Sequence, residues 1–215
     1  MVRRAPALPA HLEPLRLDGE PVAERSFEDV EIAGVDLAAA GLAHDLELLR
    51  ARLRDVSLTG ASARGLSMRD VTVDGGGWAN ADLQHAALRA VELREVRATG
   101  ANLGEARLTD VLFEDCRLDL SLFRFAKLER VVFAGCKLDE ADFYGAELNS
   151  VLFERCSLVG ASFDAARLSR CQIEGGDLSE LVGVGSLAGV RMAWPEVVQI
   201  AGLLAEANGI HVLDG

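Results

Sequence analysis

The chain has 215 residues, of which 50% are hydrophobic and 26% charged, and its formal net charge at pH 7 is −12. This length and apolar content suffice for one elongated domain. No apolar run approaches the length of a membrane span, and the excess of acidic residues disfavours direct binding to nucleic acid.

Residues 1–22 are rich in proline and show no regular hydrophobic period, which predicts an N-terminal arm or cap. Met1–Pro14 includes Arg3 and Arg4 but lacks the apolar centre of a signal peptide. We therefore expect a cytoplasmic protein that does not associate with membranes.

Residues 23–182 carry an apolar side chain at every fifth position, large at nearly all of them, and a smaller residue usually stands two positions before it. A period of five fits neither an ordinary helix nor a long strand. Two inward residues that are two positions apart nevertheless share one side of an extended segment. The polar residues between them suit exposed corners. The repeat therefore predicts a solenoid of short strands and turns whose coils hydrogen-bond to one another.

A second period of twenty residues sets four pentapeptides per coil. Phenylalanines that are twenty residues apart should stack as ladders. Two such ladders are expected on opposite walls: Phe113, Phe133 and Phe153, and Phe123, Phe143 and Phe163. Nearly eight coils at about 4.8 Å each predict a rod of roughly 37 Å.

The same period places Cys116, Cys136 and Cys156 in a parallel column. Parallel side chains lack the geometry of a disulfide, and no histidine accompanies them to hold a metal. Reduced thiols are expected.

Two irregularities interrupt the repeat. The units from Phe27 to Leu42 stand one residue out of frame with Leu48, which predicts one extra residue, as a bulge or longer corner, between positions 42 and 48. Trp78 follows three glycines and is large for an interior site, so either the wall distorts there or the indole turns outward.

Residues 183–215 leave the repeat and should cap the open end of the solenoid. Trp194–Asn208 predicts a helix, with Pro195 in its first turn and Gly209 at its C-terminal stop. A short strand at Ile210–Leu213 would follow.

This helix is apolar on more than one side, whereas a simple cap needs one apolar stripe. The surplus indicates a homodimer of two rods joined end to end, with a simple cap as the alternative. The predicted dimer interface consists of Val197, Val198, Ile200, Ala201, Leu203 and Leu204.

No arrangement of residues typical of catalysis occurs. The spacing of residues in Gly183–Ala188 matches a dinucleotide-binding fingerprint, but the segment lacks the strand–turn–helix unit that such a site requires. The four histidines are scattered, and a filled solenoid interior leaves no substrate pocket. We expect a non-enzymatic protein with no cofactor and no metal.

The charges differ between the four walls, which we number by their inward residues: the first contains Phe113, the second Leu118, the third Phe123 and the fourth Leu128. Between residues 81 and 180 the first three walls are acidic and the fourth is basic. Stacked carboxylates could compete with DNA phosphates for lysines and arginines, although many acidic surfaces serve only solubility. The candidate partner-binding carboxylates are Glu114, Asp115, Asp119, Asp139, Glu140, Asp142, Glu154 and Asp164.

Some apolar residues occupy outward positions. One group, which we call the apolar patch, comprises Leu120, Leu122, Phe125 and Tyr144; a stripe comprises Leu112, Val132 and Leu152. Exposed contiguous apolar residues often mark contacts with other proteins. Lateral packing within a wall is the alternative.

Several units, such as Ala101-Asn-Leu103 and Ala141-Asp-Phe143, resemble the A-(D/N)-L-x-x signature of pentapeptide-repeat proteins. The resemblance implies a right-handed quadrilateral β-helix. Ser186–Arg191, followed by an apolar helix, is similar to the C-terminal dimerising segment of the MfpA type. The MfpA and Qnr types protect DNA gyrase from fluoroquinolones and are described as DNA mimics. The long N-terminal arm and the basic wall depart from that pattern.

Two hypotheses follow. The first is a dimeric DNA mimic that binds DNA gyrase or another type II topoisomerase and modulates its activity or fluoroquinolone sensitivity; two end-to-end rods would span about 22 base pairs. The second is a scaffold or regulatory module that binds an unidentified protein through the apolar patch. Charge mimicry must weaken with ionic strength, whereas apolar docking should not.

Overall fold

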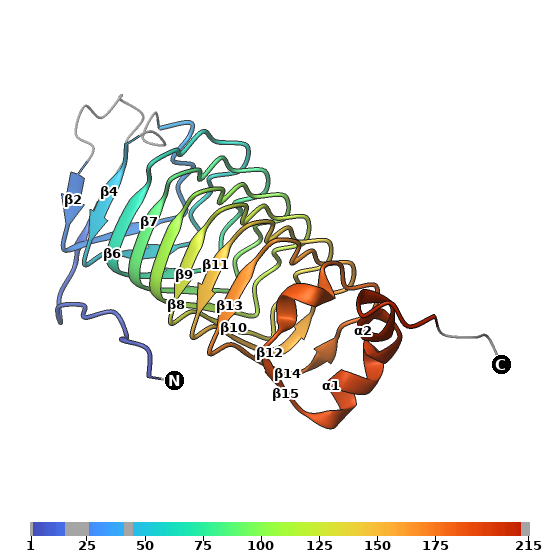
Figure 1. Cartoon of the computed structure of the whole chain (residues 1–215). Coiled ribbons are helices and arrows are strands. Elements are labelled where there is room, and N and C mark those ends of the chain that lie inside the picture. Colours follow the sequence, from blue (N-terminus) through green and yellow to red (C-terminus); the bar gives the residue numbers. More distant parts are fainter. Residues whose placement is uncertain (1, 16–25, 41–44, 212–215) are drawn as a thin grey trace.

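The computed structural model describes residues 2–15, 26–40 and 45–211 of the chain. These residues form a rod of stacked coils with the helices at its C-terminal end (Figure 1). Within the described ranges, fifteen strands belong to one sheet, in which every strand pairing is parallel. The predicted pentapeptide-repeat β-helix, of about eight turns, is confirmed.

The strands are short because each wall of a coil is only a few residues wide. Their bounds are β1 Glu13–Pro14, β2 Ser26–Glu28, β3 Val30–Ala33, β4 Glu47–Leu49, β5 Arg52–Arg54, β6 Ser67–Asp74, β7 Ala87–Arg94, β8 Arg107–Glu114, β9 Lys127–Glu129, β10 Val132–Ala134, β11 Glu147–Asn149, β12 Leu152–Ser157, β13 Arg167–Ser169, β14 Gln172–Asp177 and β15 Arg191–Met192. The helical elements are η1 Val184–Leu187, α1 Trp194–Gln199 and α2 Ala201–Ala207.

The strand register reproduces the twenty-residue period. In the middle of the rod Met68 pairs with Leu88. At the N-terminal end, however, Phe27 pairs with Leu48, an offset one residue longer. The extra residue predicted from the sequence is therefore confirmed, although positions 41–44, inside the predicted bulge, lie outside the described residues.

The core consists of the large inward residue of each pentapeptide and the small residue two positions before it, and nearly all of these are buried. Both phenylalanine ladders are present: Phe113 and Phe133 stack with ring centroids 4.9 Å apart, and Phe143 and Phe163 also stack at 4.9 Å. The ladders meet edge to face across the interior, with 5.9–6.4 Å between centroids. Opposite walls therefore fill the space between them with aromatic contacts.

Trp78 lies inside the core with 2% of its surface exposed, so an outward-turned indole is excluded. Its Nε1–H donates a hydrogen bond to the carbonyl oxygen of Val56, 3.2 Å away. The inward residue of the next coil, Ala98, is small and leaves space for the large ring.

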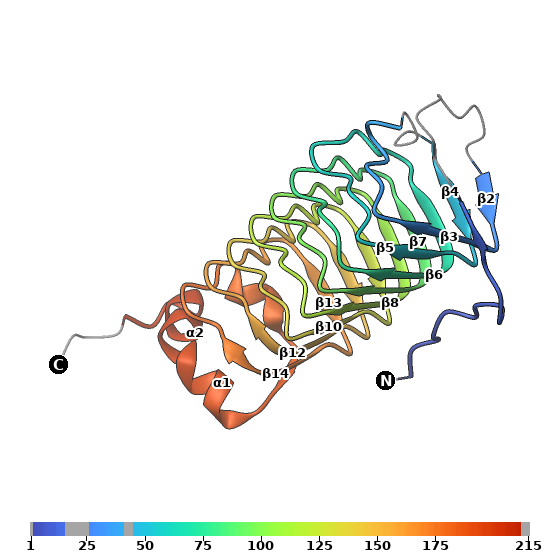
Figure 2. The ribbon, with the colours of Figure 1, turned by 180° about the vertical axis from the view of Figure 1, so that it is seen from behind.

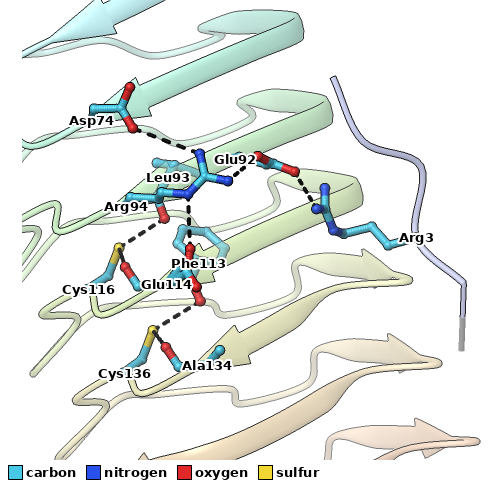
Figure 3. Close-up of polar contacts among 10 residues, drawn as sticks. All are labelled: Arg3, Asp74, Glu92, Leu93, Arg94, Phe113, Glu114, Cys116, Ala134 and Cys136. Carbon is cyan, nitrogen blue, oxygen red and sulfur yellow. Dashed lines mark hydrogen bonds and ion pairs between the residues drawn. The ribbon is translucent and has the colours of Figure 1, made fainter. Parts of the chain in front are cut away.

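The four cysteines are buried and free. Each thiol in the column lies near the carbonyl oxygen of the coil below: Cys116 Sγ is 3.4 Å from Leu93 O, and Cys136 Sγ is 3.4 Å from Phe113 O (Figure 3). Small polarisable side chains thus occupy the crowded inward sites.

The predicted C-terminal helix is two short helices. The chain turns at Ile200, whose φ is −105 and ψ 11, and this residue is fully buried in the core. The turn directs α1 against β14 and α2 against η1. Ile210 and His211 are not in a strand, and the remainder of the predicted strand lies outside the described residues.

Two side chains of α1 take the place of a further coil. Glu196 Oε1 accepts a hydrogen bond from the backbone N–H of Gly175 at 2.8 Å. Gln199 Oε1 accepts from Leu178 N–H at 3.0 Å, and its Nε2 donates to Gly176 O at 3.1 Å. The last rung of the solenoid therefore keeps hydrogen-bond partners where the repeat ends.

At the other end β1 pairs with β3 and adds a rung to the sheet. The preceding residues, 2–12, which we call the arm, run back along the outside of the rod (Figure 2). The N-terminal segment thus both covers the end of the solenoid and extends over several coils.

Candidate protein-binding surfaces

The predicted partner-binding carboxylates lie on the first three walls, and several of them are ion-paired within the chain. On the first wall, Glu114 Oε2 lies 2.9 Å from Nε of Arg94, which also contacts Glu92 (Figure 3). Glu154 pairs with the neighbouring Arg155. These two carboxylates are therefore partly neutralised.

On the second wall, Lys137 Nζ bridges two of the predicted carboxylates, 3.1 Å from Asp119 and 3.0 Å from Asp139. The hydrogen bonds to these two carboxylates raise the pKa of Lys137, and the bond to Asp139 contributes more than the bond to Asp119. On the third wall, Arg124 Nε lies 2.6 Å from Asp142. The side chains of Asp119, Asp139 and Asp142 expose only 18%, 21% and 17% of their surface.

The remaining three predicted carboxylates, Asp115, Glu140 and Asp164, make no ion pair within the described part of the chain. All three are exposed, and Asp115 and Glu140 occupy coil corners. Of the eight carboxylates that the sequence predicts for partner binding, three are therefore not neutralised by an ion pair among the described residues.

Three of the four residues of the apolar patch are exposed on the third wall and its corners, whereas Leu122 is half-buried within the wall. Leu120, Phe125 and Tyr144 expose 51%, 56% and 44% of their surface. Phe125 and Tyr144 meet edge to face, with ring centroids 5.6 Å apart. The Phe125 ring lies so close to Gly145 that a Cβ there would be 2.7 Å from it.

Leu120 and Phe125 also have left-handed backbones, with φ 58 and 57. Glycine, asparagine or aspartate adopts this conformation at lower cost than a bulky side chain. Neither burial nor backbone preference therefore accounts for these two residues. By contrast, the stripe of Leu112, Val132 and Leu152 is half-buried and paired in register within the wall.

The predicted dimer residues divide into three groups by their exposure. Ile200 is fully buried in the chain's own core, so its assignment to an interface is wrong. Val197, Leu203 and Leu204 are half-buried, and the two leucines pack against that core. Val198 and Ala201 remain exposed, Val198 by 55%.

Trp194, at the start of α1, exposes 76% of its surface, the largest aromatic exposure in the described part of the chain. The sequence places Trp194 only as the first residue of the predicted helix. Its position beyond the last repeat unit was the signal in the sequence that it could lie outside the core.

The arm makes a further set of contacts, which sequence reasoning missed. Arg3 lies 2.5 Å from Glu92 of β7 (Figure 3), and Arg4 Nη2 lies 2.9 Å from Asp70 of β6. The backbone N–H of Arg4 donates to Asp110 of β8 at 3.2 Å. Because these partners are far apart in sequence, no local pattern pairs them.

The described residues include no group of three or more histidine, cysteine, aspartate or glutamate side chains placed to hold a metal ion. Among the same residues, none of the helices has the length and apolar content needed to cross a bilayer.

Two family models match the chain. One, described as a pentapeptide repeat region, matches residues 77–143, and the other, described as pentapeptide repeats in eight copies, matches residues 146–180. No curated protein matches the sequence.

Several solved structures are similar in shape. HetL, a pentapeptide repeat protein involved in heterocyst differentiation regulation from the cyanobacterium Nostoc, is 19% identical, with 81% of this chain and 92% of HetL covered and a TM-score of 0.48. A trypsin-treated form of QnrB1, a plasmid-mediated fluoroquinolone resistance protein, is 19% identical, with 95% and 100% covered and a TM-score of 0.44.

A pentapeptide repeat protein of the Arabidopsis thaliana thylakoid lumen is 22% identical, with 40% of this chain and 61% of that chain covered and a TM-score of 0.39. Identities and scores this low do not indicate a shared partner. The repeat itself, its confirmed coil geometry and the two family models identify the chain as a pentapeptide-repeat protein.

Proposed function

We propose that the chain is a non-enzymatic, protein-binding rod whose acidic walls occupy the DNA-binding groove of a type II topoisomerase such as DNA gyrase. One observation carries the proposal: a parallel β-helix holds carboxylates in fixed register on a chain with a net charge of −12. Carboxylates on stacked coils recur at multiples of about 4.8 Å, and they would compete with phosphates for the same basic groups.

The ion pairs within the chain determine which carboxylates should matter most. A paired carboxylate must exchange its arginine or lysine for one in the groove, and the gain from this exchange is small. An unpaired carboxylate offers its full charge. Asp115, Glu140 and Asp164 are therefore expected to contribute more to binding than the five paired residues.

Binding of purified gyrase to immobilised protein tests this proposal. Glu140→Lys should weaken binding roughly tenfold, because it removes one charge contact and adds a repulsive one. Glu206→Lys is the matched control: it makes the same change of charge on an exposed residue of α2, away from the walls, and should leave binding unchanged. Binding should also fall steeply with added salt.

Gyrase supercoiling, with and without a fluoroquinolone, provides the functional readout. Salt-sensitive inhibition, or relief of drug-induced cleavage, supports the proposal. If binding is absent, or if Glu140→Lys and Glu206→Lys weaken it equally, the acidic walls are not a DNA mimic.

A second candidate function is a scaffold that docks a partner protein through the apolar patch. The observation in its favour is the pair of bulky, exposed apolar residues Leu120 and Phe125 in left-handed backbone conformations. The left-handed conformation is common to most coil corners of the described rod, but at these two corners it is combined with a bulky, exposed apolar side chain. Phe125→Ser combined with Tyr144→Ser should abolish a complex of this kind, whereas added salt should have little effect on it.

A further inference from the structure

Three neighbouring coil corners are buried, in contrast to the others. The corner residue stands two positions after the large inward residue of each pentapeptide and is generally half-buried or exposed in the described part of the rod. The exceptions are Asp70, Ala90 and Asp110, which are 6%, 0% and 7% exposed and lie one coil apart on the same edge. Ala90 is outside the hydrophobic core, so the core does not account for its burial. The arm crosses the rod at this edge.

The contacts of the arm use both its side chains and its backbone. The guanidinium of Arg4 donates to both oxygens of Asp70, at 2.9 and 3.2 Å, and Ala7 N–H donates to Asp70 Oδ1 at 3.1 Å. Arg4 N–H donates to Asp110, and Arg3 pairs with Glu92. One nitrogen of Arg4, Nη2, makes both side-chain contacts to Asp70. Together with the two backbone contacts, these charge-assisted hydrogen bonds fit an extended peptide with positively charged side chains.

The rod holds two of these carboxylates in place by itself. Arg130 donates to both oxygens of Asp110, at 2.7 and 3.0 Å, and Arg94 Nη2 lies 2.5 Å from Glu92. Their orientation therefore does not depend on the arm. A site whose groups are already oriented binds its ligand with less loss of conformational entropy.

The arm, in turn, has little apolar anchorage. Val2 is 89% exposed, and Leu12 is the first residue of the segment that is buried. The Arg4 side chain remains 52% exposed, although its partner Asp70 is covered. Because the hydrophobic contribution along residues 2–11 is small, the bound state depends mainly on charge and hydrogen bonds and can be displaced.

We propose that Asp70, Glu92 and Asp110 form a binding site for an extended, arginine-containing peptide, which we call the arginine site. The arm is its resident occupant, and a basic segment of a partner protein exchanges with the arm. The arginine site is separate from the eight carboxylates considered above, so this proposal does not depend on binding to topoisomerase.

A labelled peptide with the sequence of residues 2–12 tests the exchange by fluorescence anisotropy on the full-length chain. In the native protein the tethered arm competes at a high effective concentration, so the free peptide should bind weakly. The arm variant Arg3→Glu with Arg4→Glu should vacate the arginine site and bind the peptide roughly tenfold tighter or more. This binding should weaken when the salt rises from about 0.1 M to about 1 M.

Matched variants locate the peptide. Adding Asp70→Asn and Glu92→Gln to the arm variant should abolish binding, whereas adding Glu105→Gln, at an exposed corner of the third wall, should not. A peptide with both arginines replaced by glutamine needs no change to the protein and should bind more weakly, because its charge contacts to Asp70 and Glu92 are lost.

Equal affinity of the peptide for the native protein and the arm variant would overturn the proposal, whether binding is tight or undetectable. So would binding that survives the loss of Asp70 and Glu92, or that is equal for the arginine and glutamine peptides. A lower thermal midpoint of the arm variant without peptide binding would make the arm a purely structural brace.

Discussion

Single residues show where the close stacking of coils leaves no choice of side chain. A Cβ atom on Gly76 would lie 2.2 Å from the carbonyl oxygen of Val56, and its φ is +100. Gly60 also has a positive φ, +64, but nothing lies within 4 Å of the position of its Cβ. At Gly76 a side chain would clash with the neighbouring coil, whereas at Gly60 it would meet only the unfavourable left-handed backbone conformation.

Replacement of each glycine by alanine measures this difference. Gly76→Ala should lower the free energy of unfolding by about 3 kcal/mol or more, since one backbone must move away from another. Gly60→Ala should cost only about 1 kcal/mol, the cost of the left-handed conformation. Urea unfolding of both variants checks the prediction, and equal losses would contradict it.

Among the structural elements, α1 carries a specific polar function in addition to covering the end of the rod. Gln199 partners the backbone of Leu178, which is fully buried, and that of Gly176. Gln199→Ala should lower the free energy of unfolding by about 1–3 kcal/mol, because these groups lose their partner. Gln199→Glu retains the acceptor for Leu178 N–H. Its free energy of unfolding, measured with urea, should therefore lie between those of the native protein and Gln199→Ala. A loss for Gln199→Glu as large as that for alanine would contradict the assigned hydrogen bonds.

The arm should add stability that depends on pH. Burial raises the pKa of Glu92, but hydrogen bonds from Arg3 and Arg94 outweigh this effect and hold the pKa below its ordinary value of 4.5. The hydrogen bond from Arg130, with a smaller contribution from the Arg4 backbone, likewise lowers the pKa of Asp110 below 3.8, despite burial.

A carboxyl group whose pKa is depressed by folding stabilises the protein above its unfolded-state pKa and loses that contribution as the pH falls through the folded-state value. The stability difference between the native protein and Arg3→Ala should therefore be constant from neutral pH to about 5, and it should disappear as the pH falls through the lowered folded-state pKa of Glu92. Urea unfolding across this range measures it. A difference that persists in acid would show that Arg3 acts through something other than the charge of Glu92.

At the scale of the whole molecule, the exposed side of the cap is where a second rod would join. We propose a homodimer centred on Trp194 and Val198, 76% and 55% exposed, with Ala201 beside them and without the buried Ile200. Apolar side chains this exposed at the end of a rod are typical of a contact surface.

Val198→Asp should convert this dimer to a monomer in sedimentation experiments, because it buries a charge at the contact. Val2→Asp, at an 89% exposed residue of the arm, is the matched control and should remain dimeric. A native chain that sediments as a monomer at all concentrations would exclude the contact.

The repeat could be assigned from the sequence because the apolar and polar residues of each pentapeptide mark its inward and outward positions. The two phenylalanine ladders, the cysteine column and the extra residue before Leu48 all follow from counting along the chain. Trp78 was ambiguous, since the space for its ring comes from neighbouring coils. The break at Ile200 was missed because the apolar pattern of the cap does not reveal where a helix must turn to close a rod.

The sequence by itself determined that this chain is a parallel solenoid with capped ends and an acidic surface. The contacts between neighbouring coils recur with a fixed period, so the same five-residue pattern of apolar and polar residues recurs along the chain. Only the tertiary structure decided which carboxylates are neutralised, which cap residues face outward, and that Arg3 and Arg4 cover Glu92 and Asp70. These features join groups that are far apart in sequence through charge and hydrogen bonds. Such pairings depend on where folding places each group and leave no period in the sequence.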